Sequence, residues 1–285
     1  MAPVLDLEAA RQLAVEAAEA AGALLRAGAN GPFEVRGKGT GGDVVTDLDL
    51  AAERLILDRI LTAYPGHQVI AEEAGVVGAA RHRCVWLVDP LDGTNNVAIG
   101  LPVYAVGIAL CVDGTPVLGV VHDPVTGRTW SATRDGGASR AGGAAPSGRR
   151  APDRLRIAWI QGHAVTAHDP TARALMMVLE TRSHRVLQLW APLLAWVMLA
   201  DGHIDGIVGY RTELVDLPAG ALIALEAGLS IIGLHGGPFD HRIDLPERDR
   251  SFVAGPPEII EPLLKIVSMA DGIKASLSGL LQPLR

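Results

Sequence analysis

An apolar run that ends in two closely spaced aspartates is the strongest constraint in this 285-residue sequence. Cys84 to Val88 has the composition of a buried strand, which delivers Asp89 at its end. Pro90 has no backbone donor and turns the chain, so Asp92 can approach the same point as Asp89. The carbonyl of Leu91 lies between the two carboxylates in the sequence. It can serve as a third oxygen ligand for a metal ion that the two carboxylates bind.

The residues that follow suit phosphate binding. Gly93 permits tight backbone geometry, and Thr94 adds a hydroxyl group. If a helix begins within Gly93–Asn96, its free N–H groups form an anion site beside metals held by the aspartates. This combination suits phosphoryl transfer to water. The alternative interpretation is that residues 89–94 form only a turn, since Pro, Asp and Gly are common turn residues.

Acidic residues at other expected element ends favour the metal interpretation. They are Asp43, Asp47, Asp49, Glu72, Glu73 and Asp216. Acids at strand C-termini and helix N-termini converge in clefts, where carboxylates are hard ligands for Mg²⁺. Helix capping is the simpler explanation for Asp47, and Glu73 is more simply a neighbour of Glu72 than a ligand.

Hydrophobic spacing predicts an alternation of helices and strands. Helices are expected at residues 7–27, 49–63, 170–180, 191–200, 217–228 and 256–269. Strands are expected at residues 84–88, 104–112, 116–121, 155–160, 230–233 and 251–254. The Gly-, Ala-, Ser- and Arg-rich segment 135–150 separates an N-terminal lobe (1–150), with the metal and phosphate site, from a C-terminal lobe (151–285), with Asp216 and the substrate pocket. The extension 271–285 has no assigned role.

Charge and composition exclude some partners. The net charge is −7 and the sequence has no basic block, which argues against nucleic acid as a partner. A phosphorylated substrate would be repelled unless a bound metal reversed the local charge. Cys84 and Cys111 lie in apolar runs and indicate buried thiols in a reducing compartment. Neither a signal peptide nor an apolar stretch of membrane-spanning length is evident, so a cytoplasmic protein without membrane contact is expected.

Four segments in order resemble the inositol monophosphatase family. Residues 89–94 are similar to its Asp-Pro-[Ile/Leu]-Asp-Gly-Thr signature, and Glu72-Glu73 stands where the family has a metal-binding glutamate pair. Residues 43–49 resemble its Asp-x-Val-Thr-x-x-Asp segment, and residues 216–228 resemble its late aspartate motif. The resemblance implies an α/β (α+β) chain with a layered α-β-α-β-α, sugar-phosphatase-like fold. It also implies a homodimer that uses two or three Mg²⁺ ions.

The same resemblance assigns the metal ligands. Glu72, Asp89 and the carbonyl of Leu91 would hold a first metal. Asp89, Asp92 and Asp216 would hold a second metal, with Asp89 bridging the two. Glu72 would also take part in catalysis by positioning a third, looser ion.

Further roles concern water and phosphate. By the resemblance, Asp49 and Thr94 would orient and deprotonate the attacking water. Backbone groups of Gly93, Thr94 and Asn95 would hold the phosphate. Lys38 stands at the spacing of the family's active-site lysine, in a glycine-rich segment that is either a mobile loop over the site or a plain surface loop.

The expected substrate pocket departs from the family pattern. Residues 190–193 are Trp-Ala-Pro-Leu where the family commonly has Gly-Ser-Ala-Ala. Trp190 and the lost hydroxyl would leave a polyol with fewer hydrogen bonds. Arg211 could meet a second anionic group, and Glu213 could accept a hydrogen bond from a substrate hydroxyl.

The leading hypothesis is therefore Mg²⁺-dependent hydrolysis of a phosphomonoester of a small metabolite, such as an inositol, sugar or polyol phosphate. An alternative within the same fold is a phosphatase of a nucleotide 3′,5′-bisphosphate or of fructose 1,6-bisphosphate. An alternative of another class is a non-catalytic protein that binds metal or phosphate. All the carboxylates and the threonine that such a protein would be expected to lose are present, which favours the enzyme.

Overall fold

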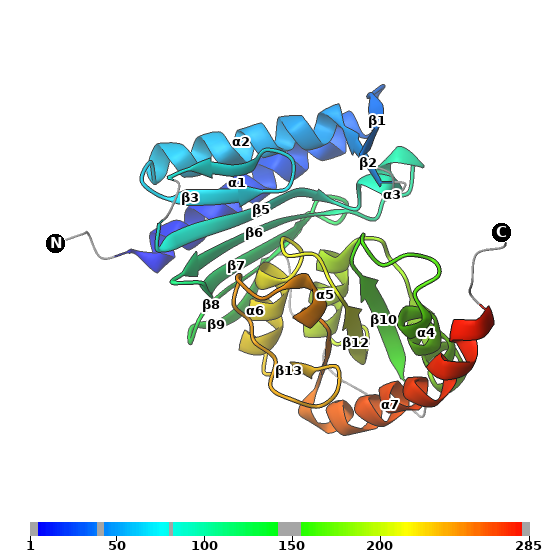
Figure 1. Cartoon of the computed structure of the whole chain (residues 1–285). Helices are drawn as coiled ribbons and strands as arrows, with labels where there is room; N and C mark the ends of the chain where they lie inside the picture. Colours follow the sequence, from blue (N-terminus) through cyan, green and yellow to red (C-terminus); the bar gives the residue numbers. More distant parts are fainter. Residues whose placement is uncertain (1–4, 39–42, 80–81, 142–154, 281–285) are drawn as a thin grey trace.

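Helices and sheets alternate in five layers (Figure 1). The computed structural model describes residues 5–38, 43–79, 82–141 and 155–280. Helices α1 (Leu7–Gly28) and α2 (Asp47–Ala63) cover the outer face of a seven-stranded sheet. The inner face of this sheet packs on α5 (Pro192–Ala200) and α6 (Pro218–Glu226), and a five-stranded sheet lies beyond them. Two more helices cover its far face, so the expected α-β-α-β-α layering is confirmed.

The seven-stranded sheet places the strand that ends in Asp89 and Asp92 near its centre. Its order is β4-β3-β5-β6-β7-β8-β9. In chain order the strands are β3 (Gln68–Ala71), β4 (Gly75–Gly78), β5 (Cys84–Asp92), β6 (Ala105–Val112), β7 (Thr115–Asp123), β8 (Arg128–Thr133) and β9 (Gly137–Ala141). β5 pairs in parallel with β3 and antiparallel with β6, and all nine of its residues are buried. A strand covered on both faces is continuously apolar, which explains why the sequence of β5 predicted a buried strand.

The outer helix α1 begins and packs as its sequence dictates. The carboxylate of Asp6 accepts hydrogen bonds from the amides of Glu8 and Ala9, both at 3.0 Å, and so caps the helix. Its buried face is built mainly from alanine: Ala10, Ala14, Ala17, Ala18 and Ala21. Such small side chains let α1 lie close to both α2 and the sheet.

The middle layer is unusually tight. Residues 218–224 of α6 are all buried, because this helix is sandwiched between the two sheets. A Cβ added at Gly119 on β7 would lie 2.6 Å from the carbonyl oxygen of Ala219. A Cβ added at Gly220 would lie 2.3 Å from the indole of Trp196 on α5. Glycine at these two positions therefore sets the separation of α6 from the sheet and from α5.

The five-stranded sheet has the order β11-β10-β12-β14-β13. In chain order its strands are β10 (Arg156–Gln161), β11 (Arg185–Leu187), β12 (Gly206–Tyr210), β13 (Ser230–Gly233) and β14 (Phe252–Gly255). β10 is parallel to β11 and β12, whereas β14 is antiparallel to its neighbours. α4 (Pro170–Arg182) and α7 (Pro257–Leu280) form the outermost layer, and Glu247–Asp249 is a short 3₁₀ helix.

Three short elements complete the fold near the end of β5. β1 (Val35–Lys38) and β2 (Asp43–Thr46) form a two-stranded antiparallel sheet. The third is the helix α3 (Thr94–Ala98), which begins directly after β5. None of the helices in the described ranges has both the length and the apolar character needed to cross a bilayer.

The structure departs from the sequence expectations at element ends, and it has strands that were not expected, among them β8 and the central strand β12. α7 continues to Leu280, past its expected end at Met269, so part of the C-terminal extension is helical. Residues 137–141 form the edge strand β9 although they were expected in the boundary segment, whose remainder from 142 lies outside the described residues. The seven-stranded sheet uses residues up to 141 and the five-stranded sheet residues from 156. The two-lobe division at residue 150 stays a prediction.

The close approach of α6 to β7 generates a test of packing. Gly119→Ala should lower the free energy of unfolding by about 1–3 kcal/mol, because its Cβ would push against the backbone of Ala219. Gly66→Ala is the matched control, since its Cβ would meet no atom within 4 Å. Urea denaturation followed by circular dichroism measures both. Equal losses in the two variants would contradict the packing argument.

Candidate active site

Two aspartates reach one point because β5 bends at its end. The pairing register of β5 with β6 shifts between Asp89 and Asp92, and the amide of Leu91 donates to Asp89 Oδ1 at 3.1 Å. Gly93 follows with φ +104°, and a Cβ there would lie 2.7 Å from the carbonyl oxygen of Val103. Only glycine combines this backbone angle with this close contact.

A third aspartate arrives from the C-terminal half of the chain. Asp216 lies just before α6, and its carboxylate lies within 4.8 Å of those of Asp89 and Asp92. The three residues are only 9%, 2% and 5% exposed, respectively. The start of α5 also faces the cluster, because the amide of Leu193 donates to Asp92 Oδ2 at 2.6 Å. The first turn of a helix favours negative charge, so the position of α5 stabilises Asp92 in its ionised form.

Burial and mutual repulsion disfavour three negative charges at this point. Burial raises the pKa of Asp89 well above its ordinary value, and the charges of Glu72, Asp92 and Asp216 raise it further. Burial and the charge of Asp216 likewise raise the pKa of Asp92. The pKa of Asp216 rises to about 7, mainly by burial and then by the charge of Glu72. The cluster therefore needs either protons or a cation to be stable at neutral pH.

A buried carboxylate–hydroxyl pair stands beside the cluster. Thr94 Oγ1 donates to Asp49 Oδ1 at 2.6 Å and lies 3.0 Å from the carbonyl oxygen of Leu91. Asp49 Oδ2 accepts from both the amide and the hydroxyl of Thr46, which caps α2 in a reciprocal capping box. Asp49 is fully buried, and this burial raises its pKa despite the hydrogen bonds. The helix cap therefore also fixes Asp49 toward Thr94.

The glutamate pair lies at the end of β3. The amide of Glu72 donates to the carbonyl of Val88 at 3.1 Å, and Lys38 Nζ donates to Glu72 Oε1 (3.0 Å) and Glu73 Oε1 (2.7 Å). Glu53 on α2 was not identified from the sequence. Its buried carboxylate accepts from the amides of Glu73 and Ala74, at 2.8 and 3.0 Å, and so holds this turn in place. A lone glutamate on an amphipathic helix gives no sequence signal for such a role.

The start of α3 supplies free donors. The amides of Thr94 and Asn95 have no backbone acceptor within the described residues, as expected for the first turn of a helix. Both residues line a cavity of about 450 Å³ that also includes Gly93, Glu72 and the three aspartates. An anionic oxygen in this cavity can therefore accept hydrogen bonds from the start of α3.

The three expected pocket residues do not all reach this cavity. Trp190 is in its lining, whereas Arg211 and Glu213 are not among the described residues that line it. An ion pair turns Arg211 aside, because its guanidinium lies 2.7 Å from Glu247 Oε1. Glu213 Oε1 accepts instead from the amide of His163 at 2.8 Å. Direct contacts of Arg211 and Glu213 with a substrate stay a prediction, and their printed partners are groups of the protein itself.

His163 was missed by the sequence analysis. It follows β10, lines the cavity and hydrogen-bonds to the carboxylate of Asp43 on β2. Burial by itself would lower the pKa of His163, but the hydrogen bond and charge of Asp43 outweigh it and raise the pKa. Because His163 lies in a loop and has no ligand spacing to another histidine, no sequence pattern predicted its role.

The glycine-rich loop expected over the site lies largely at 39–42, outside the described residues.

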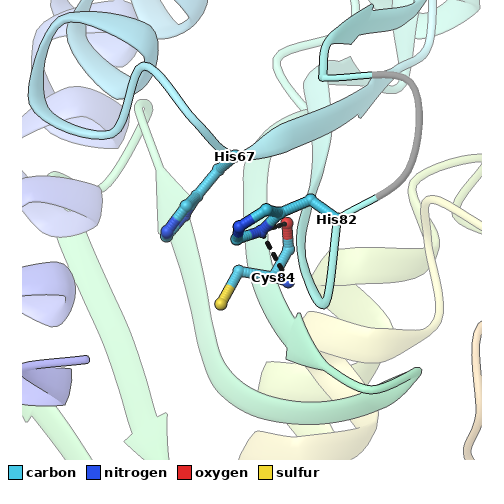
Figure 2. Close-up of side chains that lie close together, drawn as sticks. All are labelled: His67, His82 and Cys84. Carbon is cyan, nitrogen blue, oxygen red and sulfur yellow. Dashed lines mark hydrogen bonds between the residues drawn. The ribbon is translucent and has the colours of Figure 1, made fainter. Parts of the chain in front are cut away.

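A second group of metal-ligand types lies at the opposite end of β5 (Figure 2). His67, His82 and Cys84 each offer one atom within 4.8 Å of the others. The indole of Trp86 can only donate, and it donates to His67 Nδ1 at 3.0 Å. The proton of the neutral His67 ring is therefore on Nε2, and burial lowers its pKa and keeps it neutral. With neither ring nitrogen open and with Tyr64 stacked on it, His67 serves packing rather than ligation.

Comparison with known proteins places the chain in a family. The model of the inositol monophosphatase family matches residues 6–268. The chain belongs to the inositol monophosphatase family. It is 32% identical to an inositol-1-monophosphatase of Mycobacterium leprae over 96% of this chain and 94% of that protein. It is 31% identical to the Nus factor SuhB of Escherichia coli K12 over 93% of this chain and 97% of that protein.

The family assignment extends to three dimensions. The crystal structure of the extragenic suppressor protein SuhB from Bartonella henselae superposes with a TM-score of 0.81 at 27% identity. The match covers 91% of this chain and 98% of that one. The inositol monophosphatase fold therefore extends over nearly the whole chain.

The raised pKa of Asp216 predicts how stability depends on pH when metal is removed. Its ordinary value is 3.8, so between about pH 4 and 7 the folded state holds a proton that the unfolded state has lost. In EDTA, the protein should lose stability as pH rises through this range, by about 1.4 kcal/mol for each unit of raised pKa. Asp216→Asn should flatten this loss and be more stable than the parent at pH 8, as measured by thermal unfolding. Parallel pH profiles for the two proteins would contradict the prediction.

Proposed function

We propose that the chain is a divalent-metal-dependent phosphatase that hydrolyses a phosphomonoester of a small metabolite to its alcohol and inorganic phosphate. The observation that carries the proposal is the buried cluster of Asp89, Asp92 and Asp216, next to the free amides of α3 in one cavity. Membership of the inositol monophosphatase family supports the same reaction. The name of the Mycobacterium leprae relative points to an inositol phosphate as one substrate of this class.

The donor atoms fit Mg²⁺. Three carboxylates, two from β5 and one from the segment before α6, and the carbonyl of Leu91 offer hard oxygen ligands, which Mg²⁺ prefers to nitrogen or sulfur. Glu72 adds a carboxylate to the same cavity, where Lys38 neutralises part of its charge. Mg²⁺ bound there supplies positive charge to the phosphate and makes water more acidic. We propose that Asp89, Asp92 and Asp216 hold the tightest ion and that Glu72 and Leu91 contribute to a neighbouring one.

The residues around the cluster then have separate tasks. Because Thr94 gives its own proton to Asp49, its oxygen lone pairs are free to accept a hydrogen bond from water. Asp49 is the final acceptor of the proton, and its raised pKa makes it a stronger base than an exposed aspartate. The amides of Thr94 and Asn95 bind oxygens of the phosphate. Glu53 and Thr46 act by positioning Glu72 and Asp49, respectively.

The structure lends less support to a bisphosphate substrate. That alternative drew some support from Arg211 as a site for a second anionic group. Arg211 is instead paired with Glu247 and lies 3.9 Å from Asp169, so two carboxylates already compensate its charge. The non-catalytic alternative has one point in its favour, namely that the Escherichia coli relative bears the name of a Nus factor. The complete set of carboxylates in this chain favours catalysis.

A first experiment tests metal-dependent hydrolysis. Purified protein should release phosphate from at least one member of a panel of inositol, sugar, polyol and aryl-alkyl phosphates with Mg²⁺, and should lose activity in EDTA. Asp92→Asn should abolish turnover while its circular dichroism stays native, since the amide oxygen can still accept from Leu193. Metal binding by isothermal titration without hydrolysis of any panel member would contradict the proposed reaction. Undiminished turnover by Asp92→Asn would contradict the assigned metal role.

A second experiment tests the proton acceptor. Asp49→Asn should lower kcat by roughly 10²–10⁴-fold with little change in KM, because a proton acceptor acts on the chemical step. Asp47→Asn, two residues earlier in the same helix and exposed, is the control and should keep parental activity. Steady-state kinetics with a phosphate-release assay measures both variants. A loss confined to KM in Asp49→Asn would assign this residue to binding instead.

A further inference from the structure

The lining of the cavity changes from acidic to mainly apolar with distance from the cluster of Asp89, Asp92 and Asp216. Beyond the carboxylates and the start of α3, its lining comes mainly from β10, the loop that follows β10, and the segment joining β11 to α5. The apolar residues there include Trp159, Ile160, Val165, Leu189, Trp190 and Pro192. A polyol placed against this lining would leave hydroxyl groups without hydrogen-bond partners, which is costly in a buried site.

The polar side chains in this part of the cavity are partly engaged with the protein. Gln161 accepts from the indole N–H of Trp159 at 2.9 Å and donates to the carbonyl of Val165 at 3.4 Å. His163 is bonded to Asp43 through Nδ1. Among the described lining residues, the second N–H of Gln161, Nε2 of His163 and the amide of Gln188 can each meet a polar atom of a substrate, whereas most of the lining is apolar. The recognition chemistry here is therefore mainly apolar.

Trp190 is the exposed aromatic residue of this lining. It is 62% exposed, and its φ of +53° lies in the left-handed region that a bulky residue rarely adopts. The chain on either side is anchored, because Leu189 accepts a hydrogen bond from Asn96 Nδ2 at 2.7 Å and Ala191 is fully buried. Strain of this kind persists only where the surroundings enforce it, and it concentrates at ligand sites.

Asn96 also ties the backbone next to Trp190 to the proposed phosphate site. It belongs to α3, whose first amides are the proposed phosphate donors, and its side-chain amide bonds both Val103 and Leu189. The backbone at Trp190 is thus attached to α3 and does not belong to a loop that moves independently of the proposed phosphate site. A flat group attached to the phosphate oxygen through a short alkyl chain could pack on the ring of Trp190.

We propose that the physiological substrate is a phosphate monoester whose alcohol carries a flat, apolar or aromatic group, and that this group packs on Trp190. The inference rests on the proposed function of the same site and names the class of leaving group. The alcohol is selected by apolar contact, and Gln161, His163 and Gln188 meet at most a few polar atoms. The chain is accordingly a poor catalyst for fully hydroxylated alcohols, which find few partners in this lining.

The test compares two probes of different polarity. 2-Phenylethyl phosphate and myo-inositol 1-phosphate are assayed with Mg²⁺ for the parent, Trp190→Ala, Trp190→Phe and Ile99→Ala. The parent should show a kcat/KM for the aryl-alkyl ester that is about tenfold higher or more. Trp190→Ala should remove about tenfold of that preference, and Trp190→Phe should retain most of it. Ile99→Ala is the control, because Ile99 is equally exposed but outside the cavity lining.

Binding separates this inference from the proposed reaction. Both probes are titrated calorimetrically into Asp49→Asn, with and without Trp190→Ala, in the presence of Mg²⁺. If no member of the panel, these two esters included, is hydrolysed but the aryl-alkyl ester binds more tightly through Trp190, the proposed reaction fails and the assignment of the ligand class stands. If inositol phosphate is preferred, or Trp190→Ala weakens both probes equally, the inference is overturned while hydrolysis stands.

Discussion

The repulsion among three buried carboxylates organises this structure. Asp89 and Asp92 come from the end of one strand and Asp216 from the start of a helix on the other side of the layer boundary, and all three are nearly inaccessible to water. Such a cluster is unfavourable by itself, so neighbouring groups of the fold must stabilise its negative charge. The amide of Leu193 at the start of α5 donates to Asp92, and Lys38 neutralises part of the charge of Glu72. The tight glycine contacts at Gly119 and Gly220 hold α6, and with it Asp216, in place. The repulsion lowers the free energy of unfolding, and we expect a cation bound at the proposed metal site to restore it.

The strand, the turn and the metal-ligand character of residues 84–94 were predictable because the residues that determine them all lie within this short segment. The strand is apolar throughout, the proline and glycine turn the chain, and the acids are of the type that hard cations select. Long helices such as α1 and α2 were also predictable, because capping residues and apolar spacing agree. The family resemblance supplied what local chemistry could not, namely that Asp216 joins acids more than a hundred residues earlier in the chain.

The missed features share the property of depending on distant partners. Glu53 gives no signal on its own helix, since its role exists only where α2 meets the turn at Glu73. His163 acquires its role from Asp43 on the other side of the cavity. The short strands β3, β4 and β11 have few residues and are specified by pairing rather than by pattern. Arg211 was expected to meet a second anionic group, and in the structure its guanidinium is paired with Glu247, an anion of the protein itself.

The bond between Leu193 and Asp92 spans 101 residues of sequence, and this has a consequence for the timing of synthesis. A nascent chain that has emerged as far as β9 carries Asp49, Glu72, Asp89 and Asp92 but lacks both α5 and Asp216. Its acids face no middle layer, so they remain hydrated and cannot form the enclosed cluster. The proposed metal site therefore forms only when the second half of the chain docks, and we expect a chain that ends at β9 to lack it.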